Sequence, residues 1–571
     1  MIKINRLYSE PELFEPIEFF DGINLILGEK DESSNKTNGV GKSLSIEFIN
    51  YCLLKDFSYS RVSRMPKDAF PYDAYICLDF VINGVSVVSK RSIENHASPI
   101  LIVDGKETKY FNIDDASKQL TNILFSSVTD SQHPSFRAIL GPLMRDERSE
   151  FKSIIDCHDT RLKIPSDYTP HLYFFGIDPA LYSESRKLQK EIDSTTTSRA
   201  KIKRDVETLT TKSFKDAKAN LNELAGQVER VKAEMEGLES TESYEMVKDE
   251  LIELEDLLEK KRTRQSVIKS ELAKIKLFRG DNYIDDEEVA ELYERFREGL
   301  GNAIKKEIQE VTSFKKKIDN FQKTLVEGRR DTLAGELSEV NSSIRSIDER
   351  YKDKLSIIDQ KGALKSLKTT VMAYQKKLEE HSQLSAFIKK YDDYDSQIRT
   401  SKQKRSGKII LLNTLVKDAK DTVDAFQESI LSIHEYVMGN RKSFFEIKIG
   451  ENKEIVKFEF RIHDDGSHSN EREKVFFYDI AMLLTNELDA SHPGFLVHDN
   501  IFDVDQDTLV KSLNYLEEKS GELEDKQYIL TINSDKFHAE ELADLKLNID
   551  AYRRASFTKH NRFLRKHYQE L

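Results

Sequence analysis

The sequence predicts an α/β fold assembled from both ends of the chain, together with a long antiparallel coiled-coil hairpin between those ends. Three observations lead to this prediction. A glycine-rich loop lies between an apolar run and a helical segment near the N-terminus. No proline occurs between Pro179 and Pro493, and this stretch carries heptad spacing. Short strand-like segments return after residue 440.

The glycine-rich loop spans residues 28–43 and reads GEKDESSNKTNGVGKS. A strand, a glycine-rich loop and a helix N-terminus in this order form a cradle for phosphate, because loop N–H groups and the helix dipole face the anion. Lys42 can reach the β- and γ-phosphates, and the Ser43 hydroxyl can hold Mg²⁺. We therefore predict a nucleotide site whose residues are Asn38, Gly39, Val40, Gly41, Lys42, Ser43 and Leu44.

The loop departs from the pattern G-x-x-x-x-G-K-[ST], because Lys36 occupies the position of the first glycine. We interpret the departure as an insertion, in which Gly28 ends the strand and residues 29–35 bulge out before the loop closes. The alternative is a chance G-x-G-K-S in a lysine-rich chain. The flanking strand and helix favour the nucleotide site.

The composition limits the class of protein. Charged residues make up 33% of the 571 residues and hydrophobic residues 38%, which is too polar for one compact globule of this size. The net charge of −13 argues against a uniformly basic nucleic-acid-coating protein but leaves room for local basic patches. The cysteines are scattered, and no signal peptide or membrane-spanning run is found, so we expect a cytoplasmic protein that does not act at a membrane.

Residues 1–182 are predicted to form the N-terminal half of the globular part. Apolar runs that end at turn residues indicate strands, and Asn83-Gly84 is a strong signal for a two-residue hairpin turn. The predicted strands are 2–7, 17–20, 23–27, 74–82, 85–91 and 100–103.

Heptad spacing predicts an ascending arm over 183–275, an apex over 276–302 and a descending arm over 303–435. The alternative is a set of amphipathic helices on a globular core, which is less favoured because the heptad blocks are many and long. The arms are unequal, so the longer one must bend, break or add a small helical bundle. Residues 237–243 and 359–362 are candidate breaks.

Residues 436–571 are predicted to form the C-terminal half of the globular part, with strands at 444–450, 454–463, 495–497 and 527–532. A phosphate loop needs an acidic partner at the tip of a neighbouring strand to hold Mg²⁺. Asp499 follows a buried-type strand and supplies that carboxylate. A coiled-coil hairpin would return the chain to its starting point and bring Asp499 to the loop.

In the order of these parts, the chain resembles the SMC-like ABC ATPases, the group that includes RecN, RecF and the SMC proteins. It is most similar to a bacterial short-coil branch of unknown function with an HDN or HDS strand end. The resemblance implies a P-loop ABC-type ATPase head that uses ATP and Mg²⁺. Lys42 and Ser43 then match the Walker A residues, and Asp499 matches the Walker B aspartate.

The resemblance also implies roles for residues further along the chain. A serine of the loop 466–470, Ser467 or Ser469, would touch the γ-phosphate bound on a second head. Asp503 or Asp505 would lie at the seam between the heads, and Asn533 stands where many ABC proteins place a switch histidine. The magnesium-binding glutamine of the family is not placed; Arg145 lies in the right region, residues 136–148.

One departure from the family concerns catalysis. Asn500 occupies the position of the catalytic glutamate, and an amide cannot act as a general base. We therefore expect slow hydrolysis, or a base supplied by His498, by Asp503 or by a partner. A histidine at a strand end is more often packed or hydrogen-bonded than catalytic.

Basic clusters lie at 315–317, 402–408 and 553–566. The last cluster interleaves aromatic residues, which suits phosphate contacts plus stacking on nucleic-acid bases, whereas the alternative is a solvated helix face. DNA binding is thus mainly what the resemblance implies.

Two functions remain open. One is a homodimer whose heads close around ATP to engage or sense DNA and control a partner such as a nuclease, in bacterial DNA repair or anti-phage and plasmid defence. The other is a coiled-coil scaffold or sensor that binds nucleotide without turnover, which Asn500 favours.

Overall fold

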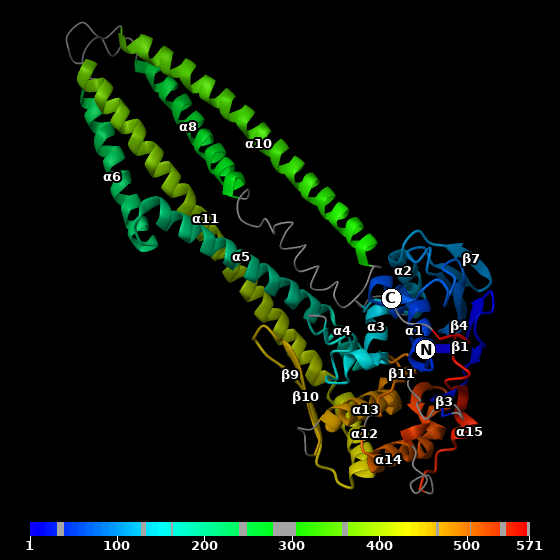
Figure 1. Cartoon of the computed structure of the whole chain (residues 1–571). Helices are drawn as coiled ribbons and strands as arrows, with labels where there is room; N and C mark the ends of the chain where they lie inside the picture. Colours follow the sequence, from blue (N-terminus) through cyan, green and yellow to red (C-terminus); the bar gives the residue numbers. More distant parts are fainter. Residues whose placement is uncertain are drawn as a thin grey trace. The chain divides into compact units, whose positions relative to one another are not determined.

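The computed structural model describes residues 1–30, 39–126, 133–161, 164–238, 248–277, 304–356, 364–463, 468–502, 504–536 and 544–567 (Figure 1). The chain divides into two units. The first combines Met1–Gln189 with Gln403–Leu571, and the second is Lys190–Lys402. The first unit, here called the head, therefore contains residues from both ends of the chain.

A five-stranded parallel sheet forms the centre of the head. Strands from the two chain ends are mixed in it: β3 from the N-terminal part lies between two C-terminal strands, and β8, also from the N-terminal part, lies next to a third. Every residue of β11 and β12 is buried, as expected for parallel strands covered on both faces. The strands, in spatial order, are β13 (Arg553–Phe557), β3 (Gly22–Gly28), β12 (Gln527–Asn533), β11 (Phe495–Asp499) and β8 (Met144–Arg145).

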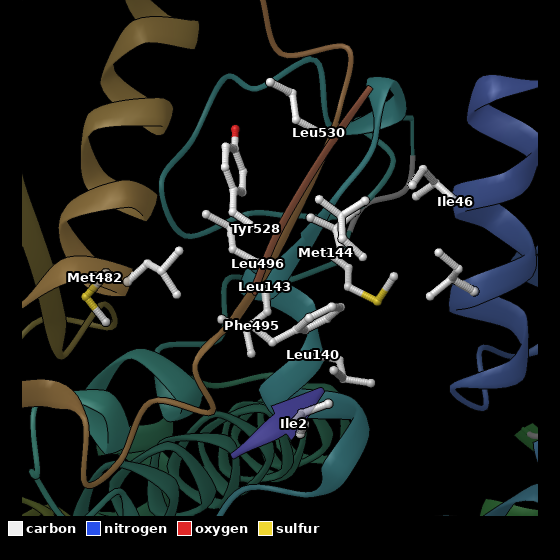
Figure 2. Packing of buried hydrophobic residues seen from close by; sticks show 14 of the residues in the cluster. Ile2, Ile46, Leu140, Leu143, Met144, Met482, Phe495, Leu496, Tyr528 and Leu530 are labelled. Carbon is white, nitrogen blue, oxygen red and sulfur yellow. The ribbon is translucent and has the colours of Figure 1, made fainter. Parts of the chain in front are cut away.

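Helices on both faces bury this sheet. Figure 2 shows Ile46 of α1 (Lys42–Cys52) on one side of the sheet residues and Met482 of α13 (His468–Leu484) on the other. Leu496 and Tyr528 lie between them and are almost fully buried. The other helices of the head are α2 (Ile113–Leu124), α3 (Phe136–Leu143), α4 (Thr169–Phe174), α12 (Lys420–Met438), α14 (Gln506–Glu518) and α15 (Ile549–Tyr552).

A six-stranded antiparallel sheet completes the N-terminal part of the head. Asn83 and Gly84 both adopt positive φ, 49° and 84°, as a two-residue hairpin turn requires, which confirms the predicted hairpin. The strands, in spatial order, are β2 (Ile17–Glu18), β1 (Ile2–Glu10), β4 (Tyr75–Ile82), β5 (Val85–Ser92), β6 (Ile100–Val103) and β7 (Lys106–Lys109). A separate hairpin joins β9 (Phe444–Ile449) to β10 (Val456–Arg461).

Long helices make up the second unit, and α5 and α11 extend from it into the head. Leu251, Leu254 and Tyr351, which follow the heptad spacing, lie in its interior and are each at most 5% exposed. The helices are α5 (Ala180–Thr210), α6 (Phe214–Leu238), α8 (Lys248–Leu277), α10 (Ile304–Ser356) and α11 (Leu364–Asp418).

Ion pairs give the direction of one helix pair. Lys354 pairs with Glu250, and Arg329 pairs with Glu271, so residue numbers fall along α10 as they rise along α8. The two helices are therefore antiparallel, as the predicted hairpin requires. The predicted apex, 276–302, lies almost entirely outside the described residues.

The helical unit nevertheless differs from a single hairpin. Lys269 of α8 pairs with Glu379 of α11, whereas Leu251 and Leu254 share an apolar cluster with Val371, so residue numbers rise together and these two helices are parallel. The α6 helix runs antiparallel to α11, because Lys218 pairs with Asp392 whereas Met235 and Val371 share an apolar cluster.

The chain thus also reverses between α6 and α8 and between α10 and α11, next to the candidate breaks at 237–243 and 359–362. The apolar interior of the helical unit explains these additional reversals. An isolated pair of helices buries one narrow stripe, whereas four segments enclose a shared core. That core contains Met235, Leu251, Leu254, Leu258, Ile344, Ile347, Tyr351 and Val371, which come from α6, α8, α10 and α11.

Candidate functional site

The glycine-rich loop enters α1 through Gly41, which is the N-cap of the helix and has φ 115°. A Cβ atom at this position would lie 2.4 Å from the Cβ atom of Phe563, so both the backbone conformation and the close approach require glycine. Residues 31–38, which include Asn38 and most of the acidic insertion before it, lie outside the described residues. Gly39 through Leu44 lie within them.

The structure brings together four of the predicted residues at one edge of the parallel sheet. Lys42 Nζ donates a hydrogen bond to Asn533 Oδ1 at the end of β12. Ser43 Oγ donates to Asp499 Oδ1 at the end of β11, over 3.1 Å. These contacts follow from the topology, because β3, β12 and β11 are adjacent and parallel and their carboxyl ends meet at the same edge.

Asp499 is only 2% exposed, although it carries the carboxylate of the site. Thr531 lies opposite it in β12 and donates a hydrogen bond from Oγ1 to Asp499 Oδ1 over 2.7 Å. Burial raises the pKa of Asp499 to about 6, and the nearby carboxylates of Glu147 and Asp146 act in the same direction. A cation bound next to this carboxylate would favour its ionised form.

The donor set fits Mg²⁺. In an octahedral site with bonds of about 2.0–2.1 Å, adjacent ligand oxygens lie roughly 2.9 Å apart. The Ser43 and Asp499 oxygens lie 3.1 Å apart. Together with Glu147 they line a small adjoining cavity of about 40 Å³, and Mg²⁺ usually keeps several water ligands. The two side chains could therefore hold the ion in company with water and phosphate oxygens.

Asn500 adopts φ 61°, a left-handed conformation that asparagine tolerates better than most residues. Its side-chain Nδ2 donates a hydrogen bond to Glu147 Oε1 over 2.6 Å. Glu147 begins the short 3-10 helix η3 (Glu147–Ser149), just after β8. A carboxylate therefore lies next to Asn500, on a residue that the sequence did not single out.

Arg145 and His498 both face Asp479 of α13. Arg145 Nη2 donates to Asp479 Oδ1 over 3.0 Å, and His498 Nε2 lies 2.9 Å from Asp479 Oδ2. The other ring nitrogen of His498 lies 3.0 Å from the Tyr528 hydroxyl. Burial lowers the pKa of His498, and the residue is absent from the described lining of the cavity of about 360 Å³ that lies over the glycine-rich loop. The structure does not bring His498 together with Lys42 and Ser43.

A cavity of about 360 Å³ lies over the loop. Besides the predicted Lys42, the cavity has cations that sequence reasoning did not assign to it: Arg61 after α1, and Arg562 and Lys566 from the basic tail. Besides the loop residues, the described lining consists of Arg61, Glu147, Asn500, Arg562, Phe563, Leu564 and Lys566. The cavity therefore combines backbone N–H groups, several cations and one carboxylate.

The residues predicted to act across a pair of heads are only partly described. Ser467 and Asp503 lie outside the described residues, as does the side chain of Ser469. Asp505 is the N-cap of α14 and accepts a hydrogen bond from Thr508 N over 3.1 Å. This role in helix capping occupies its carboxylate in the single chain.

The basic tail is not a solvated helix. Arg553–Phe557 form β13, which pairs in parallel with β3, and the following residues pack against the glycine-rich loop. The cluster 402–408 lies on α11, whereas the side chains of 315–317 lie outside the described residues. Within the described ranges, no helix combines the length and apolar character needed to cross a bilayer.

The part of the chain that supplies Asp499, Asn533 and Arg562 matches a family model. Residues 427–568 match the family described as "Uncharacterised protein conserved in bacteria (DUF2326)". Over 573 aligned residues the chain is 21% identical to "Uncharacterized protein YydD" of Bacillus subtilis (strain 168), covering 92% of this chain and 91% of that protein.

Similar solved structures include two Smc head domains. One, with a coiled coil and joint, derives from Pyrococcus yayanosii; the TM-score is 0.35 at 13% identity, over 96% of this chain and 94% of that chain. The other, with an extended coiled coil bound to the C-terminal domain of ScpA, derives from Pyrococcus furiosus. Its TM-score is 0.31 at 11% identity, over 95% of this chain and 92% of that chain.

Proposed function

We propose that this chain is a Mg·ATP-binding protein of the SMC-like ABC ATPase kind, with one nucleotide site built from both chain ends. The observation that carries the proposal is the contact of Ser43 with Asp499, 456 positions apart in sequence, beside the contact of Lys42 with Asn533. The Ser43 hydroxyl, the Lys42 ammonium and a helix N-terminus then line the cavity over the loop, and the Asp499 carboxylate lines the small adjoining cavity together with Ser43.

In this proposal each group has a separate task. The N–H groups at the start of α1 and the Lys42 ammonium bind the phosphate chain, and Asn533 orients Lys42. Ser43 and Asp499 hold Mg²⁺, which supplies charge neutralisation at the phosphates when it is bound. Thr531 fixes the Asp499 carboxylate in the orientation that faces Ser43.

We further propose that two heads pair around ATP, and that pairing engages or senses DNA and controls a separate effector such as a nuclease. The setting would be bacterial DNA repair or defence against phage and plasmids. The order of parts along the chain, with a nucleotide loop and an acidic strand end separated by long helices, supports this proposal by resemblance to the SMC-like group. Ser467 or Ser469 of one head would complete the site of the other.

The dimerisation can be tested by light scattering of the full chain with and without Mg·ATP. We expect ATP-dependent pairs for the wild type and none for Lys42→Ala, because removal of a charged phosphate contact weakens binding by about tenfold to a hundredfold. Lys118→Ala is the matched control, since Lys118 is an exposed lysine of α2 that pairs with Asp115. Equal pairing of the wild type without nucleotide would exclude ATP gating.

A second candidate is a nucleotide sensor that does not turn ATP over, and the Asn500–Glu147 contact favours it. The amide of Asn500 cannot accept a proton, and its hydrogen bond occupies one oxygen of Glu147. Phosphate release by the wild type and by Asn500→Glu separates the two functions. ATP binding with negligible release by the wild type supports the sensor; release that requires Glu147 supports an ATPase.

A further inference from the structure

The segment after β13 is fixed against the glycine-rich loop. Phe563 N donates a hydrogen bond to Val40 O over 3.1 Å, next to the close approach of Phe563 to Gly41. The Phe563 ring is 2% exposed and packs against Phe14 and Phe48, with ring centroids 4.5 and 5.4 Å away. Burial of a phenylalanine is worth about 1.5–3 kcal/mol, so this anchor holds the residues beside it in one place.

Arg562, next to that anchor, lines the cavity over the loop. Its Nη1 donates to Gly39 O and its Nε donates to Lys559 O, each over 3.1 Å. Both acceptors are neutral, and no carboxylate in the described part of the chain pairs with this guanidinium. A guanidinium carries five N–H donors, so the remaining donors and the full charge are available to an anion.

The other arginines of the tail have protein partners. Arg553 lies near Glu29 and pairs with Asp550, and Arg565 pairs with Glu12. The aromatic residues Phe557 and Phe563 are 6% and 2% exposed, so neither ring is available to stack on a nucleic-acid base. These two rings therefore do not offer the stacking surface that the sequence suggested, whereas Tyr552 is half-buried.

We propose that the segment 558–566 is a permanent wall of the nucleotide site and that Arg562 binds the phosphate chain of the nucleotide held by the same head. The inference rests on the proposed Mg·ATP function and adds a residue to it. The carbonyl oxygen of Gly39 holds the Arg562 guanidinium at the cavity without neutralising its charge. The phosphate chain of the bound nucleotide then supplies the negative charge that pairs with it.

The test measures Mg·ATP binding to the full chain by calorimetry. We expect Arg562→Ala to weaken binding by about tenfold or more, since a hydrogen bond to a charged group is lost, and Arg562→Lys to restore part of it. Arg565→Ala is the matched control: the charge change is identical, the residue is three positions away, and it is absent from the described cavity lining. It should bind like the wild type.

A second measurement covers the possibility that Arg562→Ala disturbs the tail. Phenylglyoxal modifies accessible arginines in the wild-type chain, and peptide mapping locates the adducts. Mg·ATP should protect Arg562 and leave Arg565 reactive. Unchanged binding by Arg562→Ala, while Lys42→Ala loses binding, would overturn this inference and leave the proposed function intact. Failure of the wild type to bind ATP would overturn both.

Discussion

At the scale of single residues, some side chains of the site could be predicted from the sequence and others could not. Ser43 and Asp499 stand in recognisable contexts, a glycine-rich loop and the end of an apolar strand. Glu147 has no recognisable sequence context, because it follows a strand of only two residues and contacts Asn500, which is 353 positions away in the sequence. Thr531 is a partner of Asp499 because it lies opposite it in the neighbouring strand. The sequence of one strand does not give this partner, because the register is set only when the two strands pair.

A buried glutamate offers a pH-dependent prediction. Glu473 of α13 is 3% exposed, its Oε2 atom has no partner in the described structure, and burial with the nearby Asp505 raises its pKa to about 7. The unfolded chain therefore releases this proton at lower pH than the folded chain does. Stability contributed by the neutral form is complete below pH 4.5 and is lost as the pH rises towards 7.

Urea denaturation at several pH values checks this expectation. Glu473→Gln should match the wild type near pH 4.5 and exceed its free energy of unfolding at pH 8 by roughly 3 kcal/mol. Glu487→Gln, in a 3-10 helix of the same head, is the control and should follow the wild type at every pH. If the free energy of unfolding of Glu473→Gln and of the wild type changed with pH in the same way, the pKa of Glu473 would not be raised in the folded chain.

At the scale of elements, periodicity predicted the types of helix and strand but not every partner. The apolar runs that become β11 and β12 are too short and too apolar to belong to the solvated arms, which explains their successful assignment. Heptads mark which side of a helix is buried, but they do not say which helix covers it. The pairing of α8 with both α10 and α11 therefore escaped prediction, although the candidate breaks lay in the right places.

A matched pair of leucines on α8 tests the core shared by these helices. Leu254 is 4% exposed and belongs to the core cluster, whereas Leu257, three positions later, is 42% exposed. We expect Leu254→Ala to lower the free energy of unfolding by about 2–5 kcal/mol and Leu257→Ala by less than about 1 kcal/mol. Urea denaturation followed by circular dichroism measures both. Equal effects would mean that α8 does not bury this face.

At the scale of the whole molecule, the central feature is a sheet that uses strands from both ends of the chain. Sequence reasoning predicted that Asp499 would meet the loop, because a chain that reverses direction can return to its starting point. It did not predict Arg562, which reaches the loop carbonyl of Gly39 from 523 positions away. No local pattern marks such a contact, since the basic tail has the composition of a solvated surface segment.

Binding of Mn²⁺ with ATP tests most directly whether the two chain ends form one site. Mn²⁺ replaces Mg²⁺ and reports its own binding by electron paramagnetic resonance. The proposed site predicts that the wild type binds Mn·ATP, that Ser43→Ala and Asp499→Asn each lose it, and that Asp507→Asn, an exposed carboxylate of α14, retains it. Retention of Mn·ATP by Asp499→Asn at the wild-type affinity would contradict a site built from both ends of the chain.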